Sequence, residues 1–233
     1  MGFSLKEFSR ALFANLPLGL LIVACWAGLI ALALFWRGGA FSPEPVDVVF
    51  VFDTTSSMRE EIDGTLAASE QFSELLSGQG VDCKFGLVTF GDEVRMVYRE
   101  DLSLTPSVGE FKSWLAVQQA VGGDTAPENQ LEALMTASRM AFRPKAKRVL
   151  ILITDAEYHT AGDGTDFTKL KLEDVVTGLK ERGLACYVVA KPLEGYLMLA
   201  QKTGGTFTDI DSTKNFKELI VQLGYAIARS VLD

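Results

Sequence analysis

The stretch "VDVVFVFDTTSSM" (46–58) decides the fold. Residues 46–52 are rich in β-branched and aromatic side chains, which is typical of a strand buried on both faces of a sheet. The run stops at Asp53, and hydroxyl side chains follow it. A second run of the same kind, "KRVLILIT" (147–154), is followed by Asp155. These two most apolar strands should be neighbours at the centre of a sheet, so both carboxylates should meet in one crevice at the carboxyl ends of the strands.

Predicted strands and helices alternate from here to the end of the chain. Further strands are expected at 83–90, 94–98, 185–190 and 206–210, with the first two of these forming a hairpin. Helices are expected at 57–80, 107–120, 127–142, 167–183, 194–205 and 214–232. Pro127 would stand at the first position of the third helix. The alternation predicts an α/β fold, namely a Rossmann-like, doubly wound, mostly parallel sheet with helices on both faces.

The chain begins with a long uncharged segment, residues 11–36. About 20 apolar residues in a helix span the hydrocarbon core of a bilayer, so this segment is expected to be a single transmembrane anchor helix. A cleavable signal peptide is the alternative, with small residues at 38–40 as its cleavage site. Apolar cores of signal peptides run to only about 7–15 residues, however, which favours a retained anchor.

The basic residues around this segment predict its orientation. Lys6 and Arg10 precede it, and after Arg37 no Lys or Arg occurs before Arg59. This bias places the short N-terminus, residues 1–10, in the cytoplasm and the main domain outside it. A Gly/Pro-rich linker, residues 37–45, would then lead to one domain over residues 46–233. No Asn-x-Ser/Thr acceptor occurs in the chain, which fits a bacterial inner-membrane protein whose domain faces the periplasm or the cell exterior.

The charge of the chain argues against binding to nucleic acid. The formal net charge is −8 over 233 residues, and the first 36 residues are slightly positive, so the predicted domain is the acidic part. An acidic domain is a poor partner for nucleic acid or for an anionic membrane surface. The sequence leaves the oligomeric state open.

Three short polar segments carry the chemistry. In "DTTSS", Asp53, Thr55 and Ser57 alternate, so their side chains can face the same way as the chain leaves a strand. In "GGDTAPEN", a Gly-Gly turn precedes Asp124 and Thr125. In "ILITDAEYH", Asp155 follows the second central strand. All of these offer hard oxygen ligands without a competing Cys or His cluster, which suits Mg²⁺ or Mn²⁺.

These three segments, in this order, resemble the metal-ion-dependent adhesion site of von Willebrand factor type A domains. The resemblance covers about residues 46–232. It implies a six-stranded sheet with one short antiparallel edge strand, and a metal site formed by Asp53, Thr55, Ser57, Thr125 and Asp155. The family usually has Ser where Thr55 stands and Gly where Ala156 stands, and neither difference removes a ligand. The implied strand order separates Cys83 from Cys186, which excludes a disulfide between them.

Two further residues are candidates for the rim of this site or for an alternative ligand. Asp124 competes with Thr125 for the third-loop position, with Thr125 preferred. His159, the one histidine of the chain, follows Asp155 by four residues and could contact a ligand, although a solvated loop position is its ordinary interpretation. Helix capping is the ordinary interpretation of Asp53, Ser56 and Thr125.

The resemblance implies a protein-binding function. Neutral hydroxyl ligands leave part of the positive charge of a cation uncompensated, so the cation can bind an Asp or Glu carboxylate from a partner protein. The sequence therefore predicts a membrane-anchored, metal-dependent binding module that is not an enzyme. A metal-independent envelope scaffold is one alternative. A Mg²⁺-dependent hydrolase is another, although the chain has no nucleophile-elbow, P-loop or dinucleotide-binding motif.

Overall fold

The computed structural model describes residues 44–91, 93–97, 104–123, 127–212 and 215–232. They form a six-stranded sheet in the order β3-β2-β1-β4-β5-β6. Every neighbouring pair is parallel except β2 and β3. The strands are β1 (Val46–Asp53), β2 (Cys83–Phe90), β3 (Arg95–Val97), β4 (Lys147–Ile153), β5 (Leu184–Ala190) and β6 (Phe207–Asp209). The predicted central pair, β1 and β4, and the antiparallel edge strand are confirmed.

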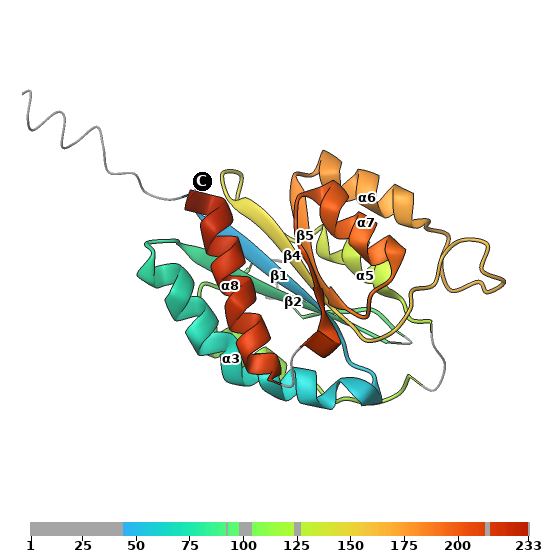
Figure 1. The fold of residues 1–233 in the computed structure, drawn as a ribbon, viewed down its shortest axis with the longest axis horizontal. Coiled ribbons are helices and arrows are strands. Elements are labelled where there is room, and N and C mark those ends of the chain that lie inside the picture. The colour runs from blue at the N-terminus through green and yellow to red at the C-terminus, as the bar shows by residue number, and fades with distance from the viewer. Residues whose placement is uncertain (1–43, 92, 98–103, 124–126, 213–214, 233) are drawn as a thin grey trace, which may run out of the picture. The chain divides into compact units, whose positions relative to one another are not determined.

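Helices cover both faces of the sheet (Figure 1). The helices are α3 (Arg59–Gly78), α4 (Val108–Ala116), α5 (Gln130–Ala137), α6 (Leu172–Glu181), α7 (Glu194–Thr203) and α8 (Phe216–Leu232), with short 3₁₀ turns at Ser56–Met58 and Ile210–Ser212. Helices α3, α4 and α8 share one hydrophobic core with the sheet, and α5, α6 and α7 share the other. The doubly wound α/β architecture predicted from the sequence is therefore present.

The side chains of strand β1 require helices on both faces of the sheet. All eight of its residues are buried. Its side chains alternate between the two cores: Phe50 and Phe52 belong to the core with α3 and α8, whereas Val49 and Val51 belong to the core with α5 and α6. In the first core, Phe50 packs edge-on against Phe72 at 5.8 Å between ring centroids. A strand that is apolar on both sides is thus the element around which the two layers assemble.

Two helices begin three or more residues after their predicted starts. Helix α5 begins at Gln130, not at Pro127, because residue 128 is held as extended chain: Glu128 forms a parallel bridge with Tyr158. Helix α6 begins at Leu172, not at 167, because the preceding residues fold back on the loop, with the Ala161 amide donating to the Leu170 carbonyl. Apolar periodicity indicated both helices but could not show these loop contacts.

Two predictions about the rest of the chain have different outcomes. Cys83 and Cys186 are free thiols on β2 and β5, with β1 and β4 between them, as expected. The predicted anchor, 11–36, lies outside the described residues, as do residues 1–10 and most of the linker. None of the helices in the described part of the chain has the length and apolar character needed to cross a membrane.

A buried ion pair closes the end of the sheet where β1 begins. The Asp47 side chain is fully buried. Its two oxygens accept hydrogen bonds from the Arg143 backbone amide at 2.6 Å and from Arg143 Nε at 2.8 Å. Arg143 also pairs with Asp82, and it donates to the carbonyls of Val46 and Asp82. One arginine therefore neutralises the only carboxylate inside the first half of β1 and ties together three segments.

We predict that Arg143→Ala destabilises the protein by about 3 kcal/mol, because it leaves the Asp47 carboxylate buried without its cation. Urea unfolding of the purified chain would measure the change. Arg95→Ala is the matched control: its pair with Glu93 is exposed by about three quarters on both sides, so its loss should cost less than about 1 kcal/mol. Equal losses for the two variants would contradict the assignment.

Candidate metal and ligand site

The register of the two central strands brings the predicted site together. Phe52 pairs with Ile153, so Asp53 lies level with Thr154, and Asp155 is one residue farther out. Thr154 Oγ1 donates to Asp53 Oδ2 at 2.6 Å, and the Thr55 amide donates to Asp53 Oδ1 at 2.9 Å. Both oxygens of Asp53 are therefore fixed in position by the protein.

The environment of Asp53 is unfavourable to its negative charge. The side chain is fully buried, and burial is the main reason why its pKa is raised. The hydrogen bonds from Thr154 and Thr55 act in the opposite direction, and the charge of Asp155 raises the pKa further. Among the described residues, no basic side chain donates a hydrogen bond to Asp53, so a bound cation would stabilise this buried carboxylate.

Thr55, Ser57 and Asp155 converge above Asp53. Thr55 Oγ1 lies 3.3 Å from Ser57 Oγ, and Ser57 Oγ donates to Asp155 Oδ1 at 3.0 Å. Thr55 and Ser57 come from the loop after β1, whereas Asp155 comes from the loop after β4. The predicted alternation in "DTTSS" thus places both hydroxyls on the side that faces the other loop.

These oxygens fit a small divalent cation. Neighbouring oxygens in an octahedral shell around Mg²⁺, at about 2.0–2.1 Å from the ion, lie about 2.9 Å apart. The separations of 3.0 and 3.3 Å in this group are close to that value. No cluster of three His, Cys, Asp or Glu side chains suited to a metal occurs in the described part of the chain. A cation held here would therefore depend on the two hydroxyls as well as on carboxylates.

The third predicted loop reaches the same place. Gly122 and Gly123 both have φ of +77°, which confirms the expected tight turn. The Ser56 amide and hydroxyl both donate to the Gly122 carbonyl, at 3.1 and 2.8 Å. A Cβ atom on Gly123 would lie 2.5 Å from Thr55 Cβ, so only glycine allows this approach. Asp124 and Thr125, the next two residues, lie outside the described residues.

Asp53 and Ser56 do not cap a helix, in contrast to their helix-capping interpretation, whereas Thr125 lies outside the described residues. Neither the turn at Ser56 nor helix α3 has a side-chain cap hydrogen bond. Asp53 instead binds the Thr55 amide and the Thr154 hydroxyl, and Ser56 binds Gly122. Pro127 does not begin α5, whose N-cap residue is Asn129. The polar residues after β1 therefore join loops to one another.

The supporting residues around Asp155 were missed by sequence reasoning. Thr154 donates to Asp53 and accepts from Gln130 Nε2 at 3.2 Å and from the Ala156 amide at 3.1 Å. Tyr196 donates to the Ala156 carbonyl at 2.7 Å, from helix α7. The fully buried Gln130 offered no signal beyond a polar residue near a helix start. Thr154, at the end of an apolar strand and beside Asp155, could have been found by asking what orients Asp53.

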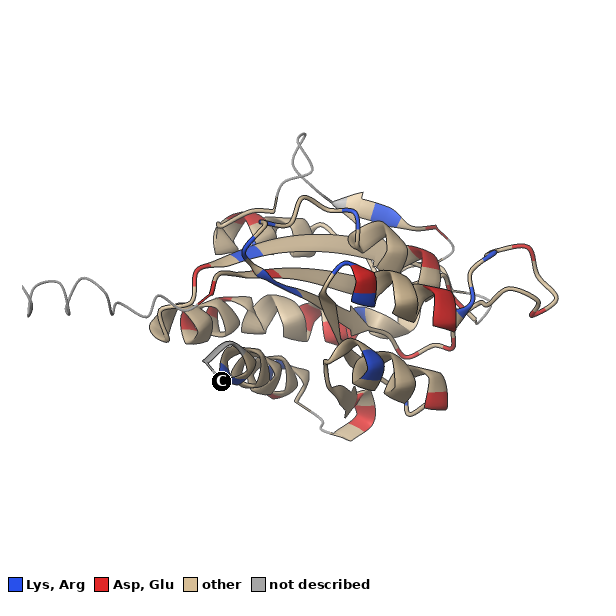
Figure 2. Cartoon of the chain, turned by 90° about the horizontal axis from the view of Figure 1, so that it is seen from above, with Lys and Arg blue, Asp and Glu red and all other residues tan. Residues whose placement is uncertain are grey.

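The position of His159 differs from the expectation of a solvated loop residue. Its side chain is only 6% exposed. Nδ1 lies 2.8 Å from Asp163 Oδ2 and 3.3 Å from Thr165 Oγ1, and the ring stacks on Phe167 at 4.6 Å. These contacts stabilise the protruding loop that follows Asp155, seen on the right in Figures 1 and 2. The role of His159 as a rim ligand stays a prediction.

The charges around the site have both signs. Lys191 Nζ, just after β5, lies 3.5 Å from Asp155 Oδ2. Glu61, in the first turn of α3, has a raised pKa, chiefly because of burial, with a smaller contribution from the charge of Asp155. Figure 2 shows acidic residues on helices on both sides of the sheet and along the protruding loop. Lys191 is thus a basic group beside a largely acidic site.

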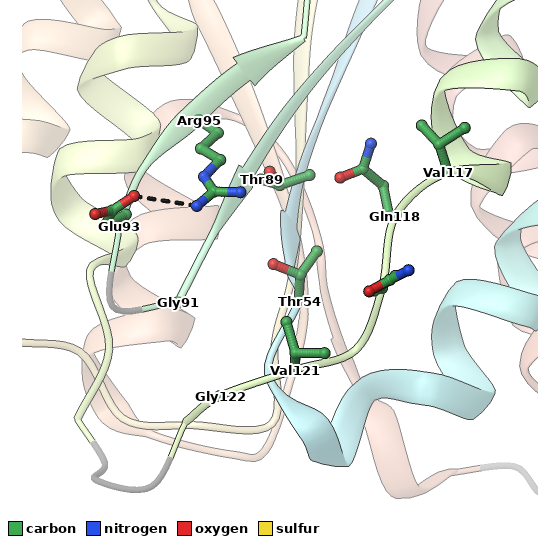
Figure 3. Close-up of a pocket in the computed structure, with 10 residues that line it drawn as sticks. Thr54, Thr89, Gly91, Glu93, Arg95, Val117, Gln118, Val121 and Gly122 are labelled. Atoms are coloured by element: carbon green, nitrogen blue, oxygen red, sulfur yellow. Dashed lines mark hydrogen bonds and ion pairs between the residues drawn. The ribbon is translucent and has the colours of Figure 1, made fainter.

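A cavity of about 470 Å³ opens next to the loops that contain Thr54 and Gly122. Figure 3 shows Arg95 and Glu93 on one side of it, Val117 and Gln118 on the other, and Thr54 and Val121 between them. Val117 and Val121 are 73% and 61% exposed. Thr54 and Gly122 line this cavity and also belong to the loops of the site, so the cavity borders those loops.

Comparison with known proteins identifies the family of this fold. The model of the von Willebrand factor type A domain matches residues 47–220. The alpha-protein kinase vwkA of Dictyostelium discoideum is 29% identical over 147 residues, which is 58% of this chain and 24% of the kinase. Human integrin beta-4 is 22% identical over 147 residues, 52% of this chain and 8% of the integrin. This chain therefore aligns with a quarter or less of either relative.

Solved structures show the same fold. A von Willebrand factor type A protein from Catenulispora acidiphila superposes with a TM-score of 0.58 at 18% identity. The superposition covers 78% of this chain and 42% of that one. At this level of identity the likeness concerns the arrangement of strands and helices.

We predict that Gly123→Ala distorts the site. The change introduces a Cβ at φ of +77° and 2.5 Å from Thr55 Cβ, so Thr55 must move. The expected loss of stability exceeds the roughly 1 kcal/mol that an alanine in this backbone region costs by itself. Thermal unfolding and the NMR signals of Thr55 and Ser57 would measure the two effects.

The matched control for this change is Gly162→Ala. Gly162 has φ of +90°, and a Cβ atom added there would have no neighbour within 4 Å, so only the backbone cost should appear. If Gly123→Ala is no more destabilising than this control and leaves the Thr55 signals in place, the close packing of the two loops is not important.

Proposed function

Because the chain belongs to the von Willebrand factor type A domain family, we propose that it is a metal-dependent protein-binding module. Mg²⁺ or Mn²⁺ would be held by Asp53, Thr55, Ser57, Asp155 and Thr125, with Asp124 as the alternative to Thr125. The partner would be a protein that presents an Asp or Glu carboxylate. Domains of this family typically mediate adhesion or other contacts between proteins, which is the general basis for this proposal.

The observation that carries the proposal is the position of Ser57. Its hydroxyl lies within 3.3 Å of Thr55 Oγ1 and 3.0 Å of Asp155 Oδ1, although these residues come from two separate loops. Helix capping would not require this convergence, and the helix that follows has no side-chain cap. A cation that needs several oxygens on one side would require it.

The residues of the site would have different roles in binding a cation. Asp53, held by Thr154 and by the Thr55 amide, supplies a fixed negative charge below the two hydroxyls. Thr55 and Ser57 supply neutral oxygens, which leave the positive charge of an ion largely uncompensated. A bound cation would supply a Lewis-acid position for one oxygen of an external carboxylate. The beginning of α3 faces the same end of the sheet and favours an anion there.

We propose that this module binds and does not catalyse. Among the described residues, the Ser57 hydroxyl hydrogen-bonds with Thr55 and Asp155 and not with His159, whose Nδ1 contacts Asp163 and Thr165. The segment 11–36 would tether the module to a bacterial inner membrane, with the N-terminus in the cytoplasm and the domain facing the periplasm or the cell exterior. The kinase activity in the name of one relative belongs to a protein about four times as long as the aligned part.

We predict that the metal-stripped protein binds one Mg²⁺ or Mn²⁺. Ser57→Ala should weaken this binding at least tenfold, because the hydroxyl that contacts both Thr55 and Asp155 is lost. Isothermal titration calorimetry would give both affinities. Ser77→Ala is the control, since Ser77 lies at the far end of α3, the helix that follows Ser57, and its hydroxyl donates to the Glu74 carbonyl. Wild-type affinity in Ser57→Ala would overturn the assignment of the metal ligands.

Capture of the partner separates this function from the metal-independent scaffold. Envelope proteins that co-purify with the tagged chain in Mg²⁺ should be released by EDTA and should be absent when Asp53→Ala is the bait. Asp53→Ala also removes the acceptor of the Thr154 hydroxyl and of the Thr55 amide, which lowers stability, so circular dichroism would verify that the variant is folded under the conditions of the assay. A partner that persists in both EDTA and the Asp53→Ala variant would favour the scaffold.

A further inference from the structure

Lys191 lies where a charge can act on both the metal and its ligand. It is the first residue after β5, the strand next to β4, so it emerges beside Asp155 at the carboxyl end of the sheet. Its ammonium group lies 3.5 Å from Asp155 Oδ2, while the other oxygen of that carboxylate accepts the Ser57 hydroxyl. Asp155 thus connects Lys191 directly to the group of converging oxygens.

The exposure of the two partners shows what the pair can do. The Asp155 side chain is 25% exposed and the Lys191 side chain is 52% exposed. An ion pair this accessible contributes little to stability, because water screens it. The half-exposed ammonium group retains donors that can contact a molecule arriving from solvent. Among the described residues, this is the one ion pair that involves a member of the predicted metal set Asp53, Thr55, Ser57, Thr125 and Asp155.

We infer that Lys191 is a second contact for the incoming carboxylate and that it also weakens the hold of the site on its cation. This inference rests on the proposed function. As a positive charge next to Asp155, Lys191 competes with a divalent ion for that carboxylate. The same charge attracts the partner's carboxylate, whose second oxygen would need a donor once the first is bound to the ion.

Lys191 therefore lowers one affinity and raises another. A site with weak affinity for the cation alone and stronger affinity for the cation together with a carboxylate retains the ion mainly when the partner is present. The two equilibria are coupled, so that each ligand strengthens the binding of the other. Lys191 is the residue that sets the size of this coupling.

The test is Lys191→Gln in the full-length protein, with Lys191→Arg and Lys202→Gln beside it. Lys202 lies in the last turn of α7, beside a cavity lined by the first residues of β4 and β5, so its replacement removes the same charge from the opposite end of the sheet. Calorimetry with Mg²⁺ and Mn²⁺ alone should show about three- to tenfold tighter binding in Lys191→Gln. The metal affinities of Lys191→Arg and Lys202→Gln should stay close to that of the wild type. The difference in metal affinity between Lys191→Gln and wild type should become smaller in 1 M salt.

Acetate is the probe for the second effect. The relaxation of its methyl protons in the presence of the Mn²⁺-loaded protein reports how strongly it binds near the ion. Lys191→Gln should weaken acetate binding about three- to tenfold, and Lys191→Arg should restore it. Opposite changes in metal and acetate affinity in one variant are not expected if Lys191 only stabilises its loop.

The outcomes distinguish this inference from the function on which it rests. If wild-type protein binds neither metal, the proposed function itself fails. If wild type binds metal and acetate but Lys191→Gln matches Lys202→Gln in both titrations, the function stands and the inference about Lys191 is overturned. Weaker metal binding in Lys191→Gln would also overturn it, because it would show that Lys191 supports the site.

Discussion

The hydrogen bond from Thr154 to Asp53 is the interaction on which the organisation of this end of the molecule depends. It joins Asp53, the last residue of β1, to Thr154, the first residue after β4. It thereby fixes a carboxylate whose pKa is raised by burial. Thr154 also accepts hydrogen bonds from Gln130 and from the Ala156 amide, so helix α5 and the loop after β4 are aligned on the same atom. The convergence of Ser57 and Asp155 follows from that alignment.

The sequence predicted the sheet well because its signals are local. A strand apolar on both faces, as 46–52 and 147–153 are, has few places other than the centre of a covered sheet, so the pairing of β1 with β4 could be predicted. The positions of Asp53, Thr55, Ser57 and Asp155 could be predicted for the same reason, since each follows the end of such a strand. Gly122 and Gly123 indicated their turn because only glycine adopts a positive φ freely.

The remainder depended on contacts between distant segments. The extended bridge of Glu128 with Tyr158 delays α5, and no periodicity in residues 127–142 indicates it. The environment of His159 is formed by Asp163 and Phe167 within a loop that lacks regular structure. The ion pair of Lys191 with Asp155 depends on the strand order and on the register of β5 against β4. Neither can be read directly from a sequence. Charges that act across strands are therefore the part of such a site that needs a structure.

The two ends of β1 deal with buried charge in different ways. At its beginning, Asp47 forms an ion pair with Arg143, so the charge of this carboxylate is neutralised by the protein itself. At its end, Asp53 accepts hydrogen bonds from Thr55 and Thr154, and none of the described residues gives it a basic donor. The ion pair at the beginning of β1 can thus maintain the fold while substitutions at the end of β1 change which ligand the site prefers. Evolution or a protein engineer could therefore replace the chemistry at the carboxyl end of this sheet without redesigning the domain that supports it.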